Sequence, residues 1–594
     1  MKKRVKAIRS LMKKQGLDAY LVPSTDPHQD EYIPEFWQRR KHISGFRGSA
    51  GDVVITQFKA GLWTDSRYFL QAEQELDNKI FKLFKMGMPE VPSLKEWIAA
   101  ELEKGEILGI DPQVLSHKSF GELFFFLKTK GIRLKCVSKN LIDAVWKDRP
   151  IPSKEKICLH PVKYAGESIK KKLARVQEKM TEQSTDLLVV TALDEIAWLF
   201  NIRGRDIKYN PVVIAYALIS KKRAMLFTDP DKLTKRIQHL LKNLVEFYAY
   251  ESFFPKLREF SQKSKRVWVD ENRVNQRIVN TLKRHAKIHF SPGPIPLIKA
   301  VKNDTEIEGF HSAHIRDGAA MVKFLFWLGQ SMQGNRITEL GAAAKLAEFR
   351  ARNTLFQGLS FETISAYRAH SAIVHYGATP ETDILLHKRD IYLIDSGAQY
   401  SDATTDITRT IFLGKPRAQH KECFTQVLKG LISLSMTSFP QGTAGRQLDT
   451  IARLPLWKNG QNYGHGTGHG IGTYLNVHEG PHAISPHRCI GVELEPGMIT
   501  TIEPGVYLED QFGIRLENVV LVVKDEKNST EDSTFYTFET LTLCPIDLNL
   551  VKREILLPEE VTWLNIYHKK VYKMLASLLN KEEIEWLDKA TRPI

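Results

Sequence analysis

Cysteines and long apolar runs are both scarce in this 594-residue sequence. Its five cysteines are scattered and never have the C-x-x-C spacing of zinc ribbons and redox motifs: Cys136, Cys158, Cys423, Cys489 and Cys544. Such usage favours a reducing compartment over a disulfide-stabilised scaffold. No uncharged apolar stretch reaches about 18 residues, and the basic N-terminus lacks the apolar segment of a signal peptide. We therefore expect a cytoplasmic protein with no membrane partner.

Dense blocks of lysine and arginine are also absent, although the formal net charge is +16. A diffuse excess of surface lysine accounts for this charge, because no basic run is interleaved with aromatic residues as in nucleic-acid-binding surfaces. We therefore expect no nucleic-acid partner. The hydrophobic share of 42% and the charged share of 26% indicate a folded protein and exclude global disorder, collagen and coiled-coil fibres.

The chain is too long for one hydrophobic core and predicts three or four domains. Proline-containing breaks at residues 149–153 and 291–296 separate the first candidates. Before each break, helices and strands alternate in a similar order. This order predicts two α/β domains and suggests a divergent duplication, with chance resemblance as the alternative. We expect four regions, which are residues 1–150, 151–297, 298–525 and a C-terminal extension, 526–594.

Two helix signals mark the later regions. Asn303 followed by Glu306 is a capping-box-like helix start. In the extension, apolar residues three or four positions apart predict an amphipathic helix docked on the rest of the chain. These residues are Val561, Leu564, His568, Val571, Leu575 and Leu578.

Two strand-like segments carry acidic residues, since residues 391–400 include Asp395 and residues 405–411 include Asp406. An antiparallel hairpin centred near residues 400 and 401 would place the two carboxylates opposite each other, with Cβ atoms about 5 Å apart. Two ionised carboxylates repel in a low-dielectric site, so that one takes up a proton or a cation lies between them. One interpretation is a cation site. The other is an exposed hairpin with solvated aspartates, although the apolar residues before Asp395 indicate burial.

A histidine-rich segment follows, with five of the chain's 19 histidines within residues 465–487. Two of them, His465 and His469, stand in the glycine-rich segment 464–470. Their i, i+4 spacing fits a zinc-binding helix, but alternate glycines forbid a stable helix. The glycines favour an extended loop or strand that metal or substrate can approach closely. A phosphate-binding loop is the weaker alternative, because the G-x-x-x-x-G-K-[ST] motif is missing.

Two further carboxylates belong to strand-like segments. Residues 498–505 predict a strand that ends at Glu503, and residues 514–520 predict a strand in which Arg515 and Glu517 share one face. A surface ion pair is the simplest interpretation of the second segment. The more specific interpretation is that both glutamates reach one cavity together with the two aspartates and the second histidine of the glycine-rich segment.

Charge balance favours the shared cavity. Four carboxylates and one neutral imidazole carry a charge of −4, which two divalent cations neutralise. Carboxylate-rich ligation without thiolates suits Mn²⁺ or a similar hard to borderline ion. Two such ions about 3.5–4 Å apart can share a hydroxide, which forms near neutral pH because the ions lower the pKa of bound water.

These motifs resemble those of the pita-bread metallopeptidases of family M24, and specifically those of the three-domain aminopeptidase P (Xaa-Pro aminopeptidase) group. The resemblance covers nearly the whole chain and includes the N-terminal residues 16–20, 26–29, 45–51 and 63–68. It implies an α/β fold class with two creatinase-N-like α/β domains, an α+β pita-bread catalytic domain and a C-terminal extension. It also implies a homodimeric, metal-dependent exopeptidase that releases the N-terminal residue from peptides with proline in second position.

The resemblance also implies a set of site residues. Two divalent ions, most simply Mn²⁺, would be bound by Asp395, Asp406, His469, Glu503 and Glu517. Among these ligands, Asp406 and Glu517 would bridge the ions.

Catalytic roles follow from the same resemblance, with attack of a metal-bridging hydroxide on the scissile carbonyl as the implied mechanism. Glu503 would carry a proton, and His375 would stabilise the reacting centre. His465 and His478 would bind substrate or transfer protons. Arg515 would orient its neighbours.

Two positions depart from the family pattern. Ala403 stands where the family usually has glycine in the hairpin turn, which should stiffen the hairpin without removing a ligand. Residues 369–372 read Ala-His-Ser-Ala ahead of His375, where a G-x-N-G-like approach is expected. Any effect of this second departure would fall on the substrate side of the site.

Three other functions fit parts of this pattern. A prolidase shares the metal set and acts only on X-Pro dipeptides, and creatine amidinohydrolase shares the domain fold without the metals. A non-catalytic pita-bread domain could serve as a binding module, for example for nucleic acid. The five intact ligands weigh against the last two, and the duplicated N-terminal region and the C-terminal extension favour aminopeptidase P over prolidase.

Overall fold

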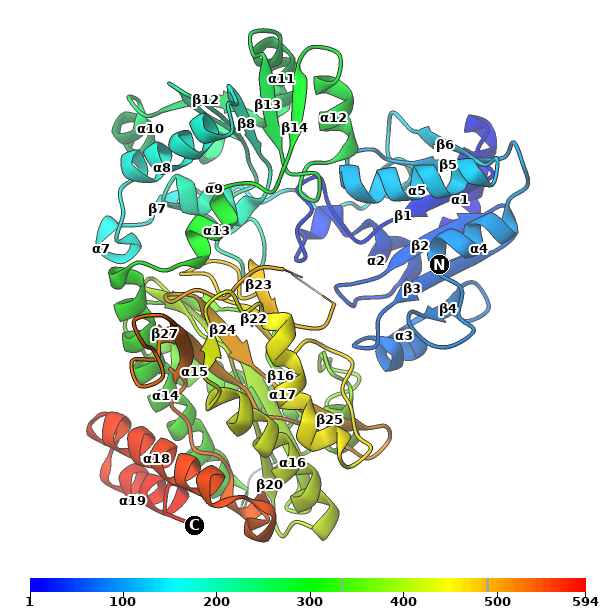
Figure 1. The fold of residues 1–594 in the computed structure, drawn as a ribbon. Helices are drawn as coiled ribbons and strands as arrows, with labels where there is room; N and C mark the ends of the chain where they lie inside the picture. Colours follow the sequence, from blue (N-terminus) through cyan, green and yellow to red (C-terminus); the bar gives the residue numbers. More distant parts are fainter. Residues whose placement is uncertain (333, 335, 488–490) are drawn as a thin grey trace. The chain divides into compact units, whose positions relative to one another are not determined.

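The computed structural model describes residues 1–332, 334, 336–487 and 491–594, so that Cys489 lies outside the described residues. The four cysteines within that range are all free. The chain forms two compact units, which Figure 1 shows in sequence colours. Unit 1 comprises residues 1–160 and 167–295, and unit 2 comprises residues 161–166 and 296–594.

Unit 1 contains two six-stranded sheets with corresponding strand orders, β4-β3-β2-β1-β5-β6 and β12-β11-β10-β8-β13-β14 (Figure 1). The first sheet consists of β1 (Ala19–Val22), β2 (Asp52–Thr56), β3 (Ala60–Thr64), β4 (Lys82–Lys85), β5 (Ile107–Ile110) and β6 (Arg133–Cys136). The second consists of β8 (Leu187–Val190), β10 (Tyr216–Ser220), β11 (Ala224–Thr228), β12 (Val245–Ala249), β13 (Arg266–Val269) and β14 (Lys287–Phe290). In each sheet, the same two neighbour pairs are antiparallel and the other three are parallel. This matching topology is what a divergent duplication predicts.

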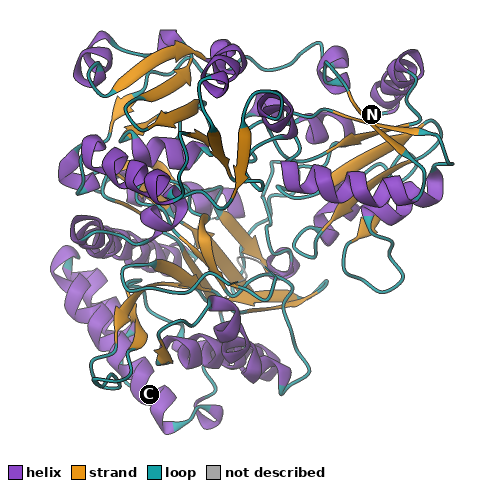
Figure 2. Cartoon of the chain, turned by 45° about the horizontal axis from the view of Figure 1, so that its top comes forward, coloured by secondary structure: helices purple, strands orange, loops and turns teal. Residues whose placement is uncertain are grey.

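Helices pack on the sheets of unit 1 (Figure 2). They are α1 (Lys2–Gln15), α2 (Arg39–Ser44), α3 (Phe69–Glu75), α4 (Leu94–Glu101), α5 (His117–Thr129), α6 (Leu141–Val145), α8 (Ile169–Glu182), α9 (Leu193–Leu199), α10 (Lys235–Leu241), α11 (Phe253–Gln262) and α12 (Gln276–Leu282). Helix α1 buries Val5, Ile8 and Met12, which lie three or four positions apart, and ends at Gly16 in the left-handed conformation with φ 62°. The predicted alternation of helices and strands is therefore confirmed in both copies.

His28 is a fully buried histidine of unit 1. Its Nδ1 lies 2.9 Å from the carbonyl oxygen of Thr191, and its Nε2 lies 2.9 Å from the hydroxyl of Tyr250. Since a carbonyl oxygen can only accept, Nδ1 carries the proton and Nε2 accepts from the hydroxyl. Burial lowers the pKa of His28 to about 4, and the bond to Thr191 offsets this effect only in part. The ring is therefore neutral in the folded protein at neutral pH.

We expect the contribution of His28 to the stability of unit 1 to be lost as the pH falls from about 6.5 to about 4. In this range the unfolded chain protonates His28 while the folded ring stays neutral, so protons favour the unfolded state. The complete loss from this one group is about 3 kcal/mol, at about 1.4 kcal/mol per pH unit. Urea unfolding at pH 5 and pH 7 measures the part of this loss that falls above pH 5, about 2 kcal/mol. His28→Gln should reduce the pH dependence by up to one proton. The exposed His239 on α10 provides the control His239→Gln, and equal slopes for the two variants would contradict the prediction.

Unit 2 is built from antiparallel strands throughout its described residues. Two three-stranded sheets have the orders β15-β18-β19 and β16-β17-β20, a six-stranded sheet has the order β21-β28-β27-β24-β22-β23, and β25 pairs with β26. The strands of the two small sheets are β15 (Phe356–Leu359), β16 (Ile364–Tyr367), β17 (Asp390–Ser396), β18 (Ala398–Tyr400), β19 (Ala403–Thr404) and β20 (Ile407–Leu413). The others are β21 (Phe439–Pro440), β22 (Gly468–Gly470), β23 (Glu479–Ile484), β24 (Ile499–Ile502), β25 (Gly505–Leu508), β26 (Phe512–Arg515), β27 (Asn518–Lys524) and β28 (Phe535–Thr540).

Four long helices surround these strands (Figures 1 and 2). They are α14 (Asp304–Ser331), α15 (Glu339–Ala351), α16 (Ala418–Ser435) and α17 (Gly445–Trp457), and α16 and α17 pack side by side. The capping box predicted at the start of α14 is confirmed, with Asn303 and Glu306 bonded reciprocally to each other's backbone N–H groups. The helix approaches the β18–β19 turn closely at Gly309, where a Cβ atom would lie 2.3 Å from the carbonyl oxygen of Asp402.

The C-terminal extension docks on the rest of unit 2 through α18 (Pro558–Leu575) and α19 (Lys581–Ala590), which contact α14 (Figure 1). Five of the six apolar positions predicted for this helix are buried on α18, namely Val561, Leu564, His568, Val571 and Leu575. The prediction is wrong for Leu578, which is 44% exposed because α18 ends at Leu575 and a short 3-10 turn carries Leu578 away from the core.

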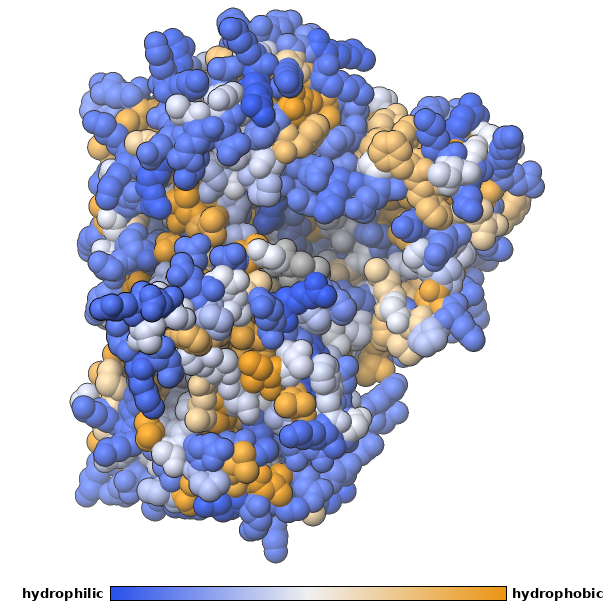
Figure 3. Space-filling view, in the orientation of Figure 1, coloured by the Kyte–Doolittle hydropathy of each residue, from blue (hydrophilic) through white to orange (hydrophobic). Residues whose placement is uncertain are grey.

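The visible surface is largely hydrophilic, with apolar side chains in scattered patches (Figure 3). Among the residues that the structure describes, no helix combines the length and the apolar composition needed to cross a membrane.

Candidate metal centre

The hairpin of β17–β18 with β19–β20 carries both predicted aspartates, but its register differs from the prediction. Asp395 pairs with Thr408 rather than with Asp406. The chain reverses through a two-residue loop flanked by the pair Tyr400 and Ala403, one position later than predicted. Asp406 therefore lies on the diagonal from Asp395. A diagonal neighbour stays on the same face of an antiparallel pair, so both carboxylates still point to one side.

A close backbone approach interrupts this hairpin beside the aspartates. A Cβ atom on Gly397 would lie 2.0 Å from the carbonyl oxygen of Thr405, so only glycine fits between β17 and β18. Asp406 lies outside the strands, one residue before β20, and its side chain is buried. Asp395 is buried as well, which excludes the interpretation as an exposed, solvated hairpin.

The glycine-rich segment is extended, as predicted, and its residues 468–470 form β22 between β23 and β24. Gly468 permits the contact with β24, since a Cβ atom there would lie 1.9 Å from the carbonyl oxygen of Thr501. This arrangement brings Nε2 of His469 to 3.5 Å from Oδ2 of Asp406 and to 3.7 Å from Oε1 of Glu503.

Both predicted glutamates lie close to Asp406 and His469. Strand β24 ends one residue before Glu503, as expected. The predicted continuous strand at residues 514–520 is wrong, because β26 ends at Arg515 and β27 begins at Asn518. Glu517 lies in this interruption, and its Oε2 accepts a hydrogen bond from Oγ1 of Thr408 at 2.9 Å.

The side chains converge on one point. Ligand atoms of Asp406, His469 and Glu517 all lie within 4.8 Å of one another. Arg515 is buried, and its Nη2 donates to Oδ2 of Asp395 at 2.6 Å. Arg515 therefore pairs with the first aspartate of the hairpin, so the interpretation as a surface pair with Glu517 is wrong.

The electrostatics of the centre are those of crowded, buried acids. Burial raises the pKa of Asp406 well above its usual range, and the carboxylates of Asp395 and Glu503 raise it further. Burial also raises the pKa of Glu517 well above its usual range, followed by the effects of Asp406 and Glu503. One guanidinium, that of Arg515, offsets only part of this negative charge. The cluster therefore binds protons or cations strongly.

The residues present fit divalent cations. Oδ1 of Asp395 and Oδ1 of Asp406 are buried and accept no hydrogen bond, which is costly for a carboxylate oxygen unless a cation lies beside it. The donors are carboxylate oxygens and one imidazole nitrogen, a set suited to hard or borderline divalent ions rather than to thiolate-preferring ones. In His469, Nδ1 lies 3.0 Å from the carbonyl of Gly470 and donates to it, which leaves Nε2 as the nitrogen with a lone pair facing the acids.

The other predicted residues lie around these side chains. Nε2 of His465 lies 2.8 Å from the hydroxyl of Tyr507, and its Nδ1 lies 3.9 Å from Oε2 of Glu503. The ring of His478 lies 4.4 Å from that of His469, centroid to centroid. His375 is half-buried in a turn directly after Val374, whose carbonyl oxygen accepts from Nη2 of Arg515 at 3.3 Å.

Two residues of the centre were not singled out from the sequence. Thr408 lies two positions after Asp406, so the period of a strand could have placed both on one face. Tyr507 receives a hydrogen bond from Nη1 of Arg515 at 2.7 Å and contacts His465, and burial raises its pKa to about 12. No sequence pattern marked this tyrosine, because its contacts join β25, β26 and the glycine-rich segment only in the folded chain.

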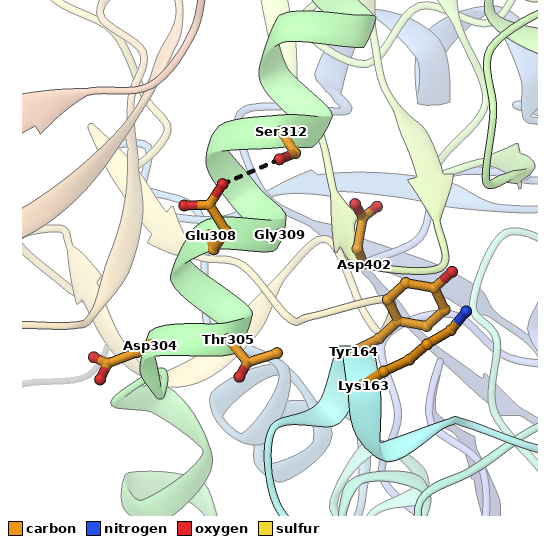
Figure 4. Close-up of a pocket in the computed structure, with 8 residues that line it drawn as sticks. All are labelled: Lys163, Tyr164, Asp304, Thr305, Glu308, Gly309, Ser312 and Asp402. Carbon is orange, nitrogen blue, oxygen red and sulfur yellow. Dashed lines mark hydrogen bonds between the residues drawn. The ribbon is translucent and has the colours of Figure 1, made fainter.

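A separate hollow of unit 2 contains none of these residues (Figure 4). It is lined by Lys163, Tyr164, Asp304, Thr305, Glu308, Gly309, Ser312 and Asp402. Its most buried acid, Asp402, already forms a bidentate pair with Nη2 of Arg316, at 2.6 and 2.7 Å. The centre around Asp406 therefore remains the candidate for chemistry.

Known protein families match parts of all four regions predicted for this chain. Residues 4–125 and 148–306 each match the creatinase/prolidase N-terminal domain. Residues 308–524 match metallopeptidase family M24, and residues 534–594 match the C-terminal region of peptidase M24.

Similar proteins match over nearly the whole of this chain. A probable Xaa-Pro aminopeptidase P from Neosartorya fischeri is 40% identical over 605 residues, which cover 100% of this chain and 92% of that protein. Aminopeptidase P2 from Arabidopsis thaliana is 40% identical over 98% of this chain and 86% of its own. The crystal structure of an X-prolyl aminopeptidase from Caenorhabditis elegans, described as a cytosolic enzyme with a di-nuclear active site, has a TM-score of 0.96. It is 36% identical and covers 100% of this chain and 99% of its own.

Proposed function

This chain belongs to metallopeptidase family M24, among its Xaa-Pro aminopeptidases, and we propose that it releases the N-terminal residue from peptides whose second residue is proline. Its fold is the predicted one, with two creatinase-type N-terminal domains followed by a pita-bread metallopeptidase domain. The observation that carries the function is the convergence of Asp406, His469 and Glu517 within 4.8 Å in a chain that matches these enzymes from end to end.

The centre binds two divalent metals, in keeping with the di-nuclear relative and the metallopeptidase family. The proposed ligands are Asp395, Asp406, His469, Glu503 and Glu517, and the proposed ions are Mn²⁺. The unpartnered buried oxygens of both aspartates and the absence of thiolates from the donor set support this assignment. When bound, the ions polarise the scissile carbonyl and make a nucleophilic water available near neutral pH.

The protein's own side chains position the reactants and transfer protons. We assign proton transfer to Glu503, which lies between His469 and His465 at 3.7 and 3.9 Å. Arg515 holds Asp395 in place and is itself held by Tyr507. The imidazoles of His375, His465 and His478 are proposed to bind the substrate and to donate to its developing negative charge.

Selection of proline rests on shape. An Xaa-Pro bond is a tertiary amide that offers no N–H group. The site therefore cannot recognise proline through a hydrogen bond from this nitrogen. We propose that an apolar, imidazole-lined pocket beside the centre accepts the ring.

The test compares substrates and chelation. We expect release of the first residue from an X-Pro-X tripeptide, little hydrolysis of an X-Pro dipeptide, and loss of activity after chelation that Mn²⁺ restores. A prolidase would prefer the dipeptide. A binding module would hydrolyse neither substrate, and retention on DNA that falls with salt would identify a nucleic-acid-binding module.

Three further predictions accompany this function, and they concern the cellular location, the oligomeric state and the domain boundaries. We propose a cytoplasmic homodimer, the location being supported by the relative described as cytosolic. We also propose domain boundaries at residues 1–150, 151–297 and 298–525, with the extension at 526–594. The matched family regions support these boundaries to within about ten residues for the later domains.

A further inference from the structure

Arg409 is a fully buried arginine in β20, next to Thr408. Within the described part of the chain, no carboxylate lies at ion-pair distance from it. A buried charge without an opposite charge is expensive unless hydrogen bonds satisfy it. Here all three guanidinium nitrogens donate, so the residue holds several segments of backbone together.

The donors of Arg409 reach two separate segments of unit 2. On one side, Nη1 donates to the carbonyl of Glu517 at 2.7 Å, and Nη2 donates to Oδ1 of Asn518 at 2.9 Å. On the other side, Nε donates to the carbonyl of Pro545 at 3.2 Å, and the second N–H group of Nη2 is shared between the carbonyl of Cys544 at 3.0 Å and the hydroxyl of Tyr567 at 2.8 Å. The side chain therefore joins the proposed ligand segment to residues 544–545 of the C-terminal extension.

Glu517 needs this support because it lies in the interruption between β26 and β27. Its amide N–H donates to the carbonyl of Thr408 at 3.1 Å, and its carboxylate accepts from the hydroxyl of the same threonine. Its carbonyl receives the bond from Arg409. Both backbone groups and the carboxylate of Glu517 are thus bonded by two consecutive residues of β20.

The extension holds the other end of this connection through Tyr567 on α18. Nη2 of Arg409 donates to the hydroxyl of Tyr567 at 2.8 Å, and that hydroxyl lies 2.9 Å from the carbonyl of Cys544. The ring of Tyr567 is buried and stacks on Trp563, with centroids 5.2 Å apart and an interplanar angle of 7°. Its position is therefore fixed by the packing of α18.

We propose that Arg409 and Tyr567 are positioning residues through which the C-terminal extension holds Glu517 in its metal-binding geometry. The extension then helps to position a proposed metal ligand, in addition to packing against the hydrophobic core. This inference rests on the proposed role of Glu517 as a ligand. Hydrogen-bonded supports of metal ligands typically change metal affinity about 10- to 100-fold when they are removed.

The experiment measures metal affinity on the full chain. Metal-stripped protein is titrated calorimetrically with Mn²⁺, and melting temperatures are recorded with and without the ion. We expect Arg409→Lys, which keeps the charge and loses the planar fork, to weaken Mn²⁺ binding at least about tenfold. Tyr567→Phe keeps the stacked ring and loses one hydroxyl, so it should weaken binding by a smaller factor of about three to ten.

Lys429→Met is the matched control. Lys429 also joins the extension to the rest of unit 2, because its Nζ bonds Glu560 at 2.5 Å and the carbonyl of Ile555 at 3.0 Å. It contacts no proposed ligand, so its variant should melt earlier than the parent and bind Mn²⁺ with the parental affinity. Arg409 and Tyr567 variants that melt earlier but bind Mn²⁺ as tightly as the parent would overturn the proposal.

The readout separates this inference from the proposed function. Mn²⁺ affinity requires no substrate, so the inference can succeed even if the parent cleaves no X-Pro peptide. With an active parent, we expect the Arg409→Lys variant to lose kcat at subsaturating Mn²⁺, to recover it at high Mn²⁺, and to keep its KM for the peptide. A lower kcat that excess Mn²⁺ does not restore would count against the proposal.

Discussion

Asp406→Asn is expected to abolish metal-dependent stabilisation and to lower peptide hydrolysis about a thousandfold or more. A ligand oxygen of Asp406 lies within 4.8 Å of those of His469 and Glu517, and asparagine offers a single neutral oxygen in its place. Loss of the ions removes several kcal/mol of transition-state stabilisation, and about 1.36 kcal/mol corresponds to a factor of ten in rate. Values of kcat/KM on an X-Pro-X peptide and a Mn²⁺ titration of metal-stripped protein test both effects.

The same substitution should reduce the loss of stability that the metal-free protein undergoes at high pH. Burial, followed by the carboxylates of Asp395 and Glu503, raises the pKa of Asp406 well above its usual range. A carboxyl whose pKa is higher in the folded state stabilises the fold at low pH and loses this contribution as the pH rises, because the unfolded chain releases its proton first. Asparagine has no such proton. The melting temperature of the chelated variant should therefore fall less between pH 5 and pH 8 than that of the chelated parent.

Asp510→Asn is the control for this pair of effects. Asp510 is exposed in the loop between β25 and β26, with a φ of 59° that asparagine also tolerates. Its variant should bind Mn²⁺, melt and turn over like the parent. If Asp406→Asn matched the parent in both Mn²⁺ affinity and turnover, Asp406 would not be a ligand.

The segments that carry the proposed ligands could be picked out from the sequence because each is locally marked. Asp395 follows an apolar run typical of a buried strand, the alternate glycines around His469 exclude a helix, and Glu503 ends a strand pattern. Charge balance then links the carboxylates without knowledge of their distances. The structure brings the marked side chains together.

The sequence could not predict the register or the supports of the centre. Moving the reversal of the hairpin by a single position changes the partner of Asp395 from Asp406 to Thr408, and turn residues alone do not fix that position. The contacts of Arg409 with Cys544 and Tyr567 span 135 and 158 residues of sequence. Only tertiary packing determines such pairs, since no local pattern relates a strand residue to a helix so far along the chain.

Glu503→Gln is expected to lower kcat for an X-Pro-X peptide by about 10²- to 10⁴-fold, the usual contribution of a positioned general acid or base. The substitution keeps the shape of the side chain and removes its capacity to accept a proton. The carboxylate is well placed for this role because its two oxygens lie 3.7 Å from His469 and 3.9 Å from His465. Its side chain is 19% exposed, which leaves it open to a bound peptide.

Mn²⁺ affinity, measured on the same variant, separates proton transfer from metal binding. The amide oxygen that this substitution introduces can still face an ion, so affinity should fall less in Glu503→Gln than in Asp406→Asn while turnover falls comparably. Glu526→Gln is the control, because Glu526 lies on the surface with a side chain 76% exposed and pairs only with Lys524 in the described ion pairs. Cleavage near the parental rate by Glu503→Gln would remove Glu503 from the mechanism.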